Sequence, residues 1–167
     1  EAMAIGRTFK ESFQKALRSL EIGCRGFGGG GKFGGRECPS IEKIRKGLIR
    51  PTAERVFYIR YAMLAGMSDD EIHEATSIDI WFLRQLRGII ESETELSHKG
   101  LLNLDEDLLR RAKEAGFTDL QISEICGTKI RNIKQLRREF GINTVYRLVD
   151  TCAAEFKAVT PYYYSTY

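Results

Sequence analysis

The sequence repeats itself at an offset of 50 residues, and this repeat limits the folds that the chain can adopt. When residues 60–87 are aligned with residues 110–137, eleven of 28 positions are identical, whereas chance would give about two. The identical pairs are Arg60/Arg110, Ala62/Ala112, Ala65/Ala115, Gly66/Gly116, Asp69/Asp119, Ile72/Ile122, Glu74/Glu124, Ile80/Ile130, Gln85/Gln135, Leu86/Leu136 and Arg87/Arg137. We therefore expect two similar structural units that pack side by side.

Both units carry the same local signals for a helix, a short helix, a turn and a longer helix. A glycine ends the first helix in the left-handed conformation, and a capping box then starts the short helix. These signals are Gly66, then Ser68 with Glu71, in the first unit, and Gly116, then Thr118 with Gln121, in the second. Apolar residues at helical spacing predict the longer helices: Ile80, Leu83, Leu86, Ile89 and Ile90 in the first unit, and Ile130, Ile133, Leu136 and Phe140 in the second. Each unit is thus predicted to resemble a helix-turn-helix.

The chain before the short helix of the first unit contains further helix signals and a glycine-rich segment. Thr8 with Glu11 forms a capping box, and the apolar spacing that follows predicts a helix from Thr8 to Leu20. Further helices are predicted from Ser40 to near Gly47 and from Pro51 to Ala65. Residues 23–35 include eight glycines. Because this composition offers little side chain to pack, we expect a mobile loop there.

These patterns predict an all-α fold: a helical bundle with two repeated helix-turn-helix-like units and extended terminal connectors. No strand is predicted between Thr8 and Gly141. After Gly141 the helical period is lost, and Pro161 interrupts the sequence. We expect this part to be an extended connector whose aromatic side chains dock on a neighbouring surface. Glu1 in place of an initial Met and the aromatic end suggest that both ends continue into a longer protein.

Composition limits the classes of function. The 26 basic and 23 acidic side chains are spread along the chain and give a formal charge of +3, so no large field of one sign is expected. No stretch approaches the roughly 20 apolar residues that cross a bilayer, so a membrane is not an expected partner. The widely spaced Cys24, Cys38, Cys126 and Cys152 lack zinc-site spacing and predict reduced thiols in an intracellular protein.

Trp81 and Phe82 are the candidate core or interface anchors of the first unit. They stand beside Ile78 and Ile80 just after the predicted turn. Large aromatic side chains in such a position usually dominate local packing. We therefore predict that Trp81 is buried and that Phe82 lies on or beside the same apolar face. Tyr162, Tyr163 and Tyr164 are the corresponding candidate anchors of the C-terminal connector.

Other chemistries fit the sequence less well. The string Gly26 to Lys32 has the spacing of a phosphate-binding loop, but Phe33 replaces the required hydroxyl residue and no apolar strand precedes it. His73 and His98 have no partner at ligand spacing. No catalytic, cofactor-binding or metal-binding set can be assembled from the remaining residues.

A tandem helix-turn-helix module that binds nucleic acid is the alternative function. In the second unit, basic residues lie on or near the last helix: Lys129, Arg131, Lys134, Arg137 and Arg138. The matching helix of the first unit instead begins with Asp79, Trp81 and Phe82. A helix that reads a DNA groove needs polar or basic contacts at this point, so the sequence does not favour nucleic acid as a partner.

Long strings at both ends of the sequence resemble the large chain of carbamoyl phosphate synthetase. MAIGRTFKESFQKALRSLE, Met3 to Glu21, is similar to the segment where the first ATP-grasp half gives way to a helical middle domain. VDTCAAEFKAVTPYYYSTY, Val149 to Tyr167, resembles the segment that leads into the second ATP-grasp half. IDIWFLRQL, Ile78 to Leu86, is similar to the middle domain itself, whereas residues 23–35 match no family pattern.

The resemblance implies a domain division and a role. Residues 1–7 would end the first ATP-grasp half, residues 8–148 would form the helical oligomerisation domain, and residues 149–167 would lead towards the second ATP-grasp half. No catalytic, cofactor or metal residue of the family carries over to this segment. The implied role is therefore that of a non-catalytic scaffold that joins other domains of the large chain and forms homo-oligomers.

The implied parent protein is a glutamine-hydrolysing ligase. It would make carbamoyl phosphate from bicarbonate, glutamine-derived ammonia and two ATP for arginine and pyrimidine biosynthesis. ATP and Mg²⁺ or Mn²⁺ would bind in the ATP-grasp halves, and a glutaminase small chain would be a partner. The expected location is the cytoplasm, or an organelle if the source is eukaryotic.

Overall fold

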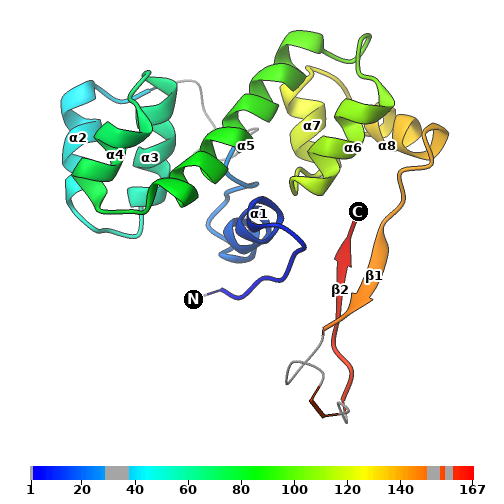
Figure 1. Cartoon of the computed structure of the whole chain (residues 1–167). Coiled ribbons are helices and arrows are strands. Elements are labelled where there is room, and N and C mark those ends of the chain that lie inside the picture. Colours follow the sequence, from blue (N-terminus) through cyan, green and yellow to red (C-terminus); the bar gives the residue numbers. More distant parts are fainter. Residues whose placement is uncertain (1, 29–37, 150–154, 157–159) are drawn as a thin grey trace.

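The computed structural model describes residues 2–28, 38–149, 155–156 and 160–167, which form a helical body and a β-hairpin (Figure 1). Within these ranges the helices are α1 (Phe9–Ser19), α2 (Ile41–Ile49), α3 (Arg55–Leu64), α4 (Asp69–Thr76), α5 (Ile80–Lys99), α6 (Glu106–Glu114), α7 (Asp119–Ile125) and α8 (Ile130–Glu139). The strands β1 (Val145–Leu148) and β2 (Tyr163–Thr166) pair antiparallel, with Val145 opposite Thr166. The predicted helical bundle is confirmed.

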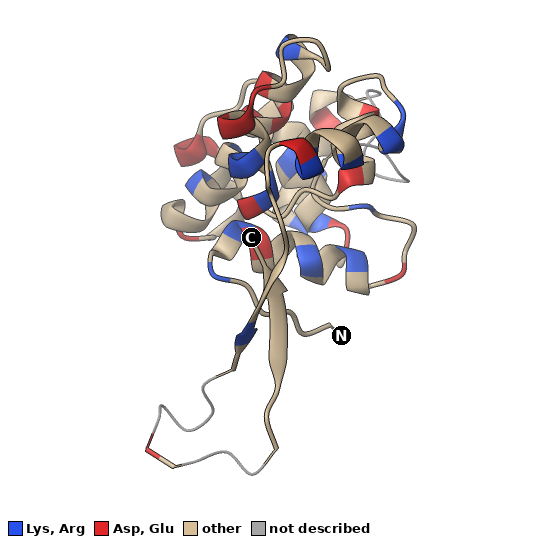
Figure 2. Cartoon of the chain, turned by 90° about the vertical axis from the view of Figure 1, so that its right-hand side faces the viewer, with Lys and Arg blue, Asp and Glu red and all other residues tan. Residues whose placement is uncertain are grey.

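Helix α5 runs between two groups of helices. In Figure 1, α2, α3 and α4 lie at one end of α5, whereas α6, α7 and α8 lie at the other, and α1 lies beside its middle. The hairpin projects from the helical body, which carries basic and acidic residues interspersed (Figure 2). None of the helices in the described part of the chain is long and apolar enough to cross a membrane.

The two repeated units have matching structures, as predicted: α3, α4 and α5 form the first unit, and α6, α7 and α8 form the second. The glycines that end α3 and α6 have left-handed backbones, with φ of +86° at Gly66 and +90° at Gly116. In both units the amide after this glycine donates a hydrogen bond of 3.0 Å to the carbonyl five residues earlier. A complete capping box then starts the short helix in each unit.

An ion pair between identical residues ties the last helix of each unit to the start of its short helix. Arg87 Nε donates to Asp69 at 2.7 Å in the first unit, and Arg137 Nε lies 3.2 Å from Asp119 in the second. Both aspartates occupy the first turn of a helix, where the backbone amides favour negative charge. The repeat therefore extends from the backbone turns to side-chain contacts.

The base of the glycine-rich segment is packed into the core, so the expectation of a mobile loop is wrong for residues 24–28. The Phe27 ring is 1% exposed. Two buried amide side chains hold the backbone here, because Gln121 Nε2 donates to the Gly28 carbonyl at 2.8 Å and to Gln14 Oε1 at 3.1 Å. A Cβ at Gly28 would collide with the carboxylate of Glu93. Residues 29–35, including most of the string compared with a phosphate-binding loop, lie outside the described residues.

Some helix limits and the C-terminal part differ from the sequence prediction. Helix α2 continues to Ile49, and α3 begins only at Arg55, because Pro51 and Thr52 lie outside any helix and residues 53–54 form a turn. Among the described residues after Gly141, no helix forms, and the sequence did not predict that Val145–Leu148 and Tyr163–Thr166 pair as strands. Short strands without alternating polarity leave no such signal.

The cysteines in the described residues are free thiols: Cys24 is buried, Cys126 is half-buried and Cys38 is exposed. Burial raises the pKa of the Cys24 and Cys126 thiols above its usual value. These two side chains therefore remain protonated at neutral pH and are poor nucleophiles. Cys152 lies outside the described residues.

The repeat provides a matched pair of glycine substitutions. A Cβ at Gly116 would lie 2.9 Å from Glu11 Cα, whereas a Cβ at Gly66 would meet nothing within 4 Å. Gly66→Ala should lower the free energy of unfolding by about 1–2 kcal/mol, the cost of a left-handed alanine. Gly116→Ala should cost about 1–3 kcal/mol more, because α1 must also move. Urea denaturation of both variants measures the difference, and equal losses would contradict the close packing of α1 on Gly116.

Candidate functional site

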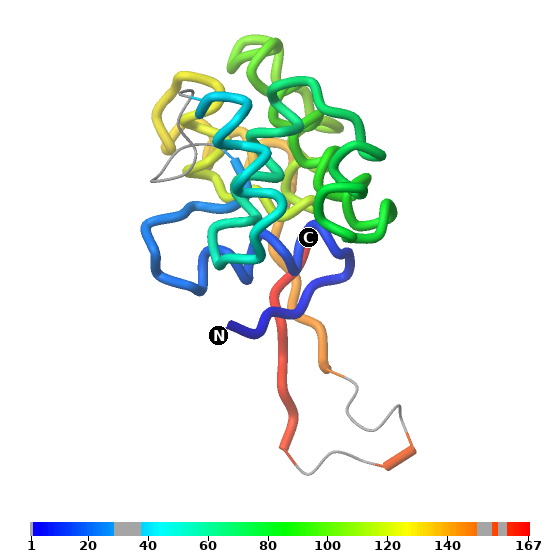
Figure 3. The backbone as a smooth tube through the Cα atoms, turned by 90° about the vertical axis from the view of Figure 1, so that its left-hand side faces the viewer, coloured from blue at the N-terminus to red at the C-terminus, as the bar shows by residue number. Residues whose placement is uncertain are grey.

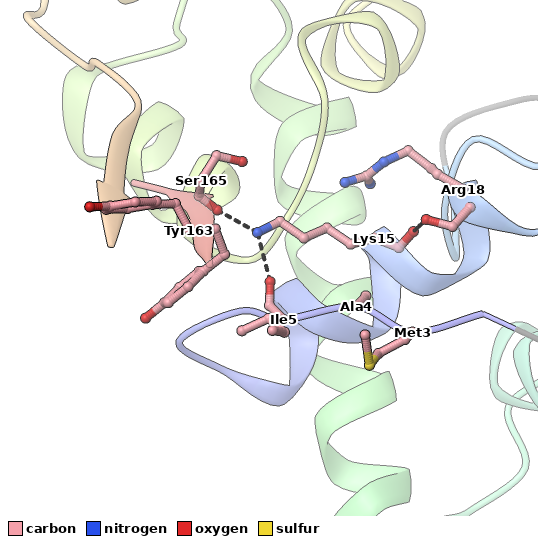
Figure 4. A pocket seen from close by; sticks show the side chains of 9 residues that line it. Met3, Ala4, Ile5, Lys15, Arg18, Tyr163 and Ser165 are labelled. Carbon is pink, nitrogen blue, oxygen red and sulfur yellow. Dashed lines mark hydrogen bonds between the residues drawn. The ribbon is translucent and has the colours of Figure 1, made fainter. Parts of the chain in front are cut away.

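Helix α1 contacts both the segment that precedes it and the strand that ends the chain. We call residues 3–7 the leading segment and residues 163–167 the closing strand. These two segments are far apart in sequence, but the C-terminal end of the chain returns to α1, so both segments contact this helix (Figure 3). An open hollow of about 540 Å³ lies between them (Figure 4). Its lining residues are Met3, Ala4, Ile5, Lys15, Arg18, Ser19, Tyr163, Tyr164 and Ser165.

Glu11 joins the leading segment, α1 and the closing strand. Its side chain is buried, and the residue is 2% exposed. The carboxylate accepts hydrogen bonds from the Arg7 amide at 2.8 Å, from Lys15 Nζ at 2.7 Å and from Thr166 Oγ1 at 3.0 Å. A buried carboxylate with several charge-assisted or hydroxyl donors is well compensated for its loss of water.

The predicted capping box at the start of α1 is only half formed. Thr8 Oγ1 accepts from the Glu11 amide at 3.2 Å, as a capping residue should. The Glu11 carboxylate, however, accepts from the amide of Arg7 rather than from that of Thr8. Since Glu11 also reaches Thr166, packing against the closing strand explains why the carboxylate departs from the local pattern.

Lys15, one turn after Glu11, makes a second set of contacts to the same two segments. Its ammonium donates to the Ile5 carbonyl at 3.0 Å and to the Ser165 carbonyl at 2.5 Å, as the dashed lines in Figure 4 show. It also pairs with Glu11 at 2.7 Å. Lys15 and Glu11 therefore each contact the leading segment and the closing strand.

Close backbone contacts fix α1 on its neighbours. A Cβ at Gly6 would lie 2.8 Å from the Ser12 amide nitrogen, so the leading segment packs tightly against the first turns of α1. At the other end of the helix, Arg18 Nη1 donates to the Gly116 carbonyl at 2.9 Å. Burial lowers the pKa of the Arg18 guanidinium, and the nearby Cys24 and Glu11 oppose this shift.

The aromatic end of the closing strand is held by the second unit. The Tyr167 ring lies 4.8 Å from Lys113 Nζ and 5.5 Å from the guanidinium carbon of Arg137. Arg137 Nη1 also donates to the Tyr167 hydroxyl at 3.2 Å. Cations over an aromatic face are attracted by its negative charge distribution. Sequence reasoning missed this contact, although Arg137 stood out as one of the residues identical in both units.

The prediction that Trp81 is buried is wrong. Trp81 is 52% exposed and Phe82 is 42% exposed. Helix α5 buries the face that carries Leu83, and at 3.6 residues per turn Trp81 lies almost opposite that residue. Both rings instead pack edge-on against Phe9 of α1, with centroids 5.7 and 5.3 Å away. We call Phe9, Trp81 and Phe82 the aromatic patch.

The three candidate tyrosines lie apart from the aromatic patch, on the closing strand or next to it. Tyr162 and Tyr163 are exposed, and Tyr164 is half-buried with Lys15 Nζ 5.8 Å from its ring centroid. Phe9 and Lys15 lie on different sides of α1, about 120° apart around the helix at 3.6 residues per turn. The structure thus separates the candidate anchors into two groups on the two sides of this helix.

The structure does not favour the nucleic-acid alternative. Arg137, one of the basic residues of α8, is engaged with Asp119 and Tyr167. Basic and acidic residues are interspersed along the helices drawn in Figure 2, rather than clustered by sign as in a nucleic-acid interface. No group of three or more potential metal ligands occurs among the described residues.

The exposure of Trp81 leads to a stability prediction. Phe27→Ala, at a fully buried ring, should lower the free energy of unfolding by about 3–5 kcal/mol. Trp81→Ala should lower it by about 1–2 kcal/mol, because half of the ring is already in water. Urea denaturation of the two variants in monomeric samples provides the comparison. A loss at Trp81 as large as that at Phe27 would show that Trp81 belongs to the core.

Comparison with known proteins identifies similar sequences. Residues 1–141 match the family described as "Carbamoyl-phosphate synthetase large chain, oligomerisation domain". The whole chain is 53% identical to part of the carbamoyl phosphate synthase large chain of Rhodopirellula baltica, 47% to that of Archaeoglobus fulgidus and 48% to that of Synechocystis sp.. The chain spans 16%, 16% and 15% of the lengths of these relatives.

Proposed function

The chain belongs to the family of oligomerisation domains of carbamoyl phosphate synthetase large chains, and from this premise we propose that it is a non-catalytic spacer and association domain of a longer ligase. The contacts of α1 carry the spacer part of the proposal. Its side chains hold the leading segment and the closing strand together, through Glu11 and Lys15. A spacer that sets the relative position of the domains before and after it needs such a junction.

We propose the domain division implied by the resemblance. Residues 1–7 end the first ATP-grasp half, residues 8–148 form the oligomerisation domain, and residues 149–167 lead towards the second ATP-grasp half. The family match over residues 1–141 supports the central part of this division. The small share of each relative that the chain spans supports the presence of further domains in the parent.

The activity proposed for the parent is the synthesis of carbamoyl phosphate from bicarbonate, glutamine-derived ammonia and two ATP. ATP with Mg²⁺ or Mn²⁺ would be bound by the ATP-grasp halves, and a glutaminase small chain would supply ammonia. The similarity to carbamoyl phosphate synthase large chains supports this assignment. We place the parent in the cytoplasm or a eukaryotic organelle, which the free thiols of Cys24, Cys38 and Cys126 support.

We propose that Trp81 and Phe82 anchor an association surface. Exposed aromatic side chains that are already positioned by a neighbour lose little freedom on binding and often dominate an interface. The contact of both rings with Phe9 provides such positioning. Tyr162, Tyr163 and Tyr164 are proposed to anchor the hairpin against other domains of the large chain.

Self-association tests the proposed role of the aromatic patch. Replacing Trp81 and Phe82 together by alanine should weaken association of the chain at least tenfold, as loss of two interface anchors predicts. Leu102→Ala is the control, because Leu102 is 97% exposed and lies outside the patch. Sedimentation equilibrium measures the dissociation constants. Unchanged association in the double variant would exclude the patch as the association surface.

The proposed lack of a nucleotide site is also testable. The chain should neither hydrolyse ATP nor bind it with micromolar affinity, because the ATP-grasp halves lie outside this segment. In the described part of the glycine-rich segment, the Phe27 amide and the Gly28 carbonyl are already hydrogen-bonded to the side chains of Gln14 and Gln121. Titration calorimetry with ATP and Mg²⁺ gives the answer, and a one-site isotherm of micromolar affinity would contradict the proposal.

A further inference from the structure

We propose that Glu11 and Lys15 form a clamp that couples the leading segment to the closing strand, so that a displacement of either segment is transmitted to the other. This inference rests on the proposed spacer function and names the residues that perform it. We call these two side chains the clamp. The clamp would let the spacer transmit movement between the domains that it joins, rather than merely separate them.

The first argument is that the clamp contacts are duplicated. Glu11 accepts from the Arg7 amide and from the Thr166 hydroxyl, whereas Lys15 donates to the carbonyls of Ile5 and Ser165. Each side chain thus bonds to both segments, and the two side chains bond to each other. Two points of attachment define the orientation of a segment as well as its distance, which a single hydrogen bond does not.

The second argument is that a charged side chain, Glu11, occupies a buried position. Glu11 is 2% exposed, and taking a carboxylate out of water is costly even when it is paired. Well-packed apolar residues generally stabilise such a position at least as well as an ion pair. An ion pair with further hydrogen bonds, however, is directional and tolerates only one arrangement of its partners. This chemistry suits a positioning role.

The third argument is that each segment is also held by a contact outside the clamp. The lack of space for a Cβ at Gly6 shows that the leading segment cannot approach α1 more closely. The closing strand pairs with β1 over four residues, from Val145 opposite Thr166 to Leu148 opposite Tyr163. A shift of Thr166 therefore carries the hairpin with it, because the ladder hydrogen bonds link the two strands.

Hydrogen exchange on the monomeric chain tests the coupling. Gly6→Ala forces the leading segment away from α1 and should raise exchange rates at residues 163–166 about fivefold or more, the lower range of coupling between sites. In a variant with Glu11→Gln and Lys15→Met, the closing strand should already exchange faster, and adding Gly6→Ala should produce no further increase. Glu106→Gln is the matched control, because Glu106 pairs with Arg110 at the same spacing on an exposed surface.

A second experiment measures transmission in the opposite direction and disturbs the core less. Thr166→Val removes the hydroxyl that Glu11 accepts from, and it should speed exchange of the Arg7 amide. Thr166→Ser keeps the hydroxyl and should restore the original rate. Coupling between two sites must be reciprocal, so both experiments should agree. Circular dichroism shows whether each variant remains folded.

The proposal would be overturned if Gly6→Ala accelerated exchange only in the leading segment, or if the Arg7 amide exchanged no faster in Thr166→Val than in Thr166→Ser. Either result would mean that the two segments move independently on α1. The proposed association and nucleotide properties would not be affected by that outcome, because they are measured by sedimentation and calorimetry. Conversely, if association did not depend on the aromatic patch, or if the chain bound ATP, the proposed function would be contradicted. The clamp would still stand if the exchange experiments showed coupling.

Discussion

The position of α1 on the second unit is the constraint on which the other contacts depend. Gly116 has no side chain, so the backbone of Glu11 lies directly against it. The same position lets Gln14 bond to the buried Gln121. With α1 held there, the Glu11 carboxylate reaches the closing strand, and Phe9 on another face contacts Trp81 and Phe82. One short helix therefore positions both surfaces to which we assign a role.

The two repeated units show how the same local signals acquire different surroundings. Gly66 and Gly116 end equivalent helices with nearly the same backbone angle, yet only Gly116 is covered by another element. The residues at the third position of the following helices differ in the same way, because Glu71 is exposed and Gln121 is buried. The second unit packs against α1 and the closing strand, whereas the corresponding turn of the first unit, at Gly66, faces open space.

Helix α1 also links the proposed spacer and association roles. Its aromatic residues Phe9 and Phe13 stack with centroids 5.5 Å apart on one side, and Glu11 and Lys15 lie on the other. Phe13 in turn contacts the buried Phe27, so the aromatic patch is continuous with the core. Such a helix can support an association surface on one face while it orders the chain segments on the other.

The sequence by itself determined the helical fold, the two units and most helix limits, because glycine stops, capping residues and helical spacing act within a few residues. Only the tertiary structure decided the exposure of Trp81, the pairing of the two strands and the partners of Glu11. Glu11 and Thr166 are 155 residues apart in sequence. No local pattern encodes a contact of that kind, since it exists only after α1, the second unit and the closing strand have packed together.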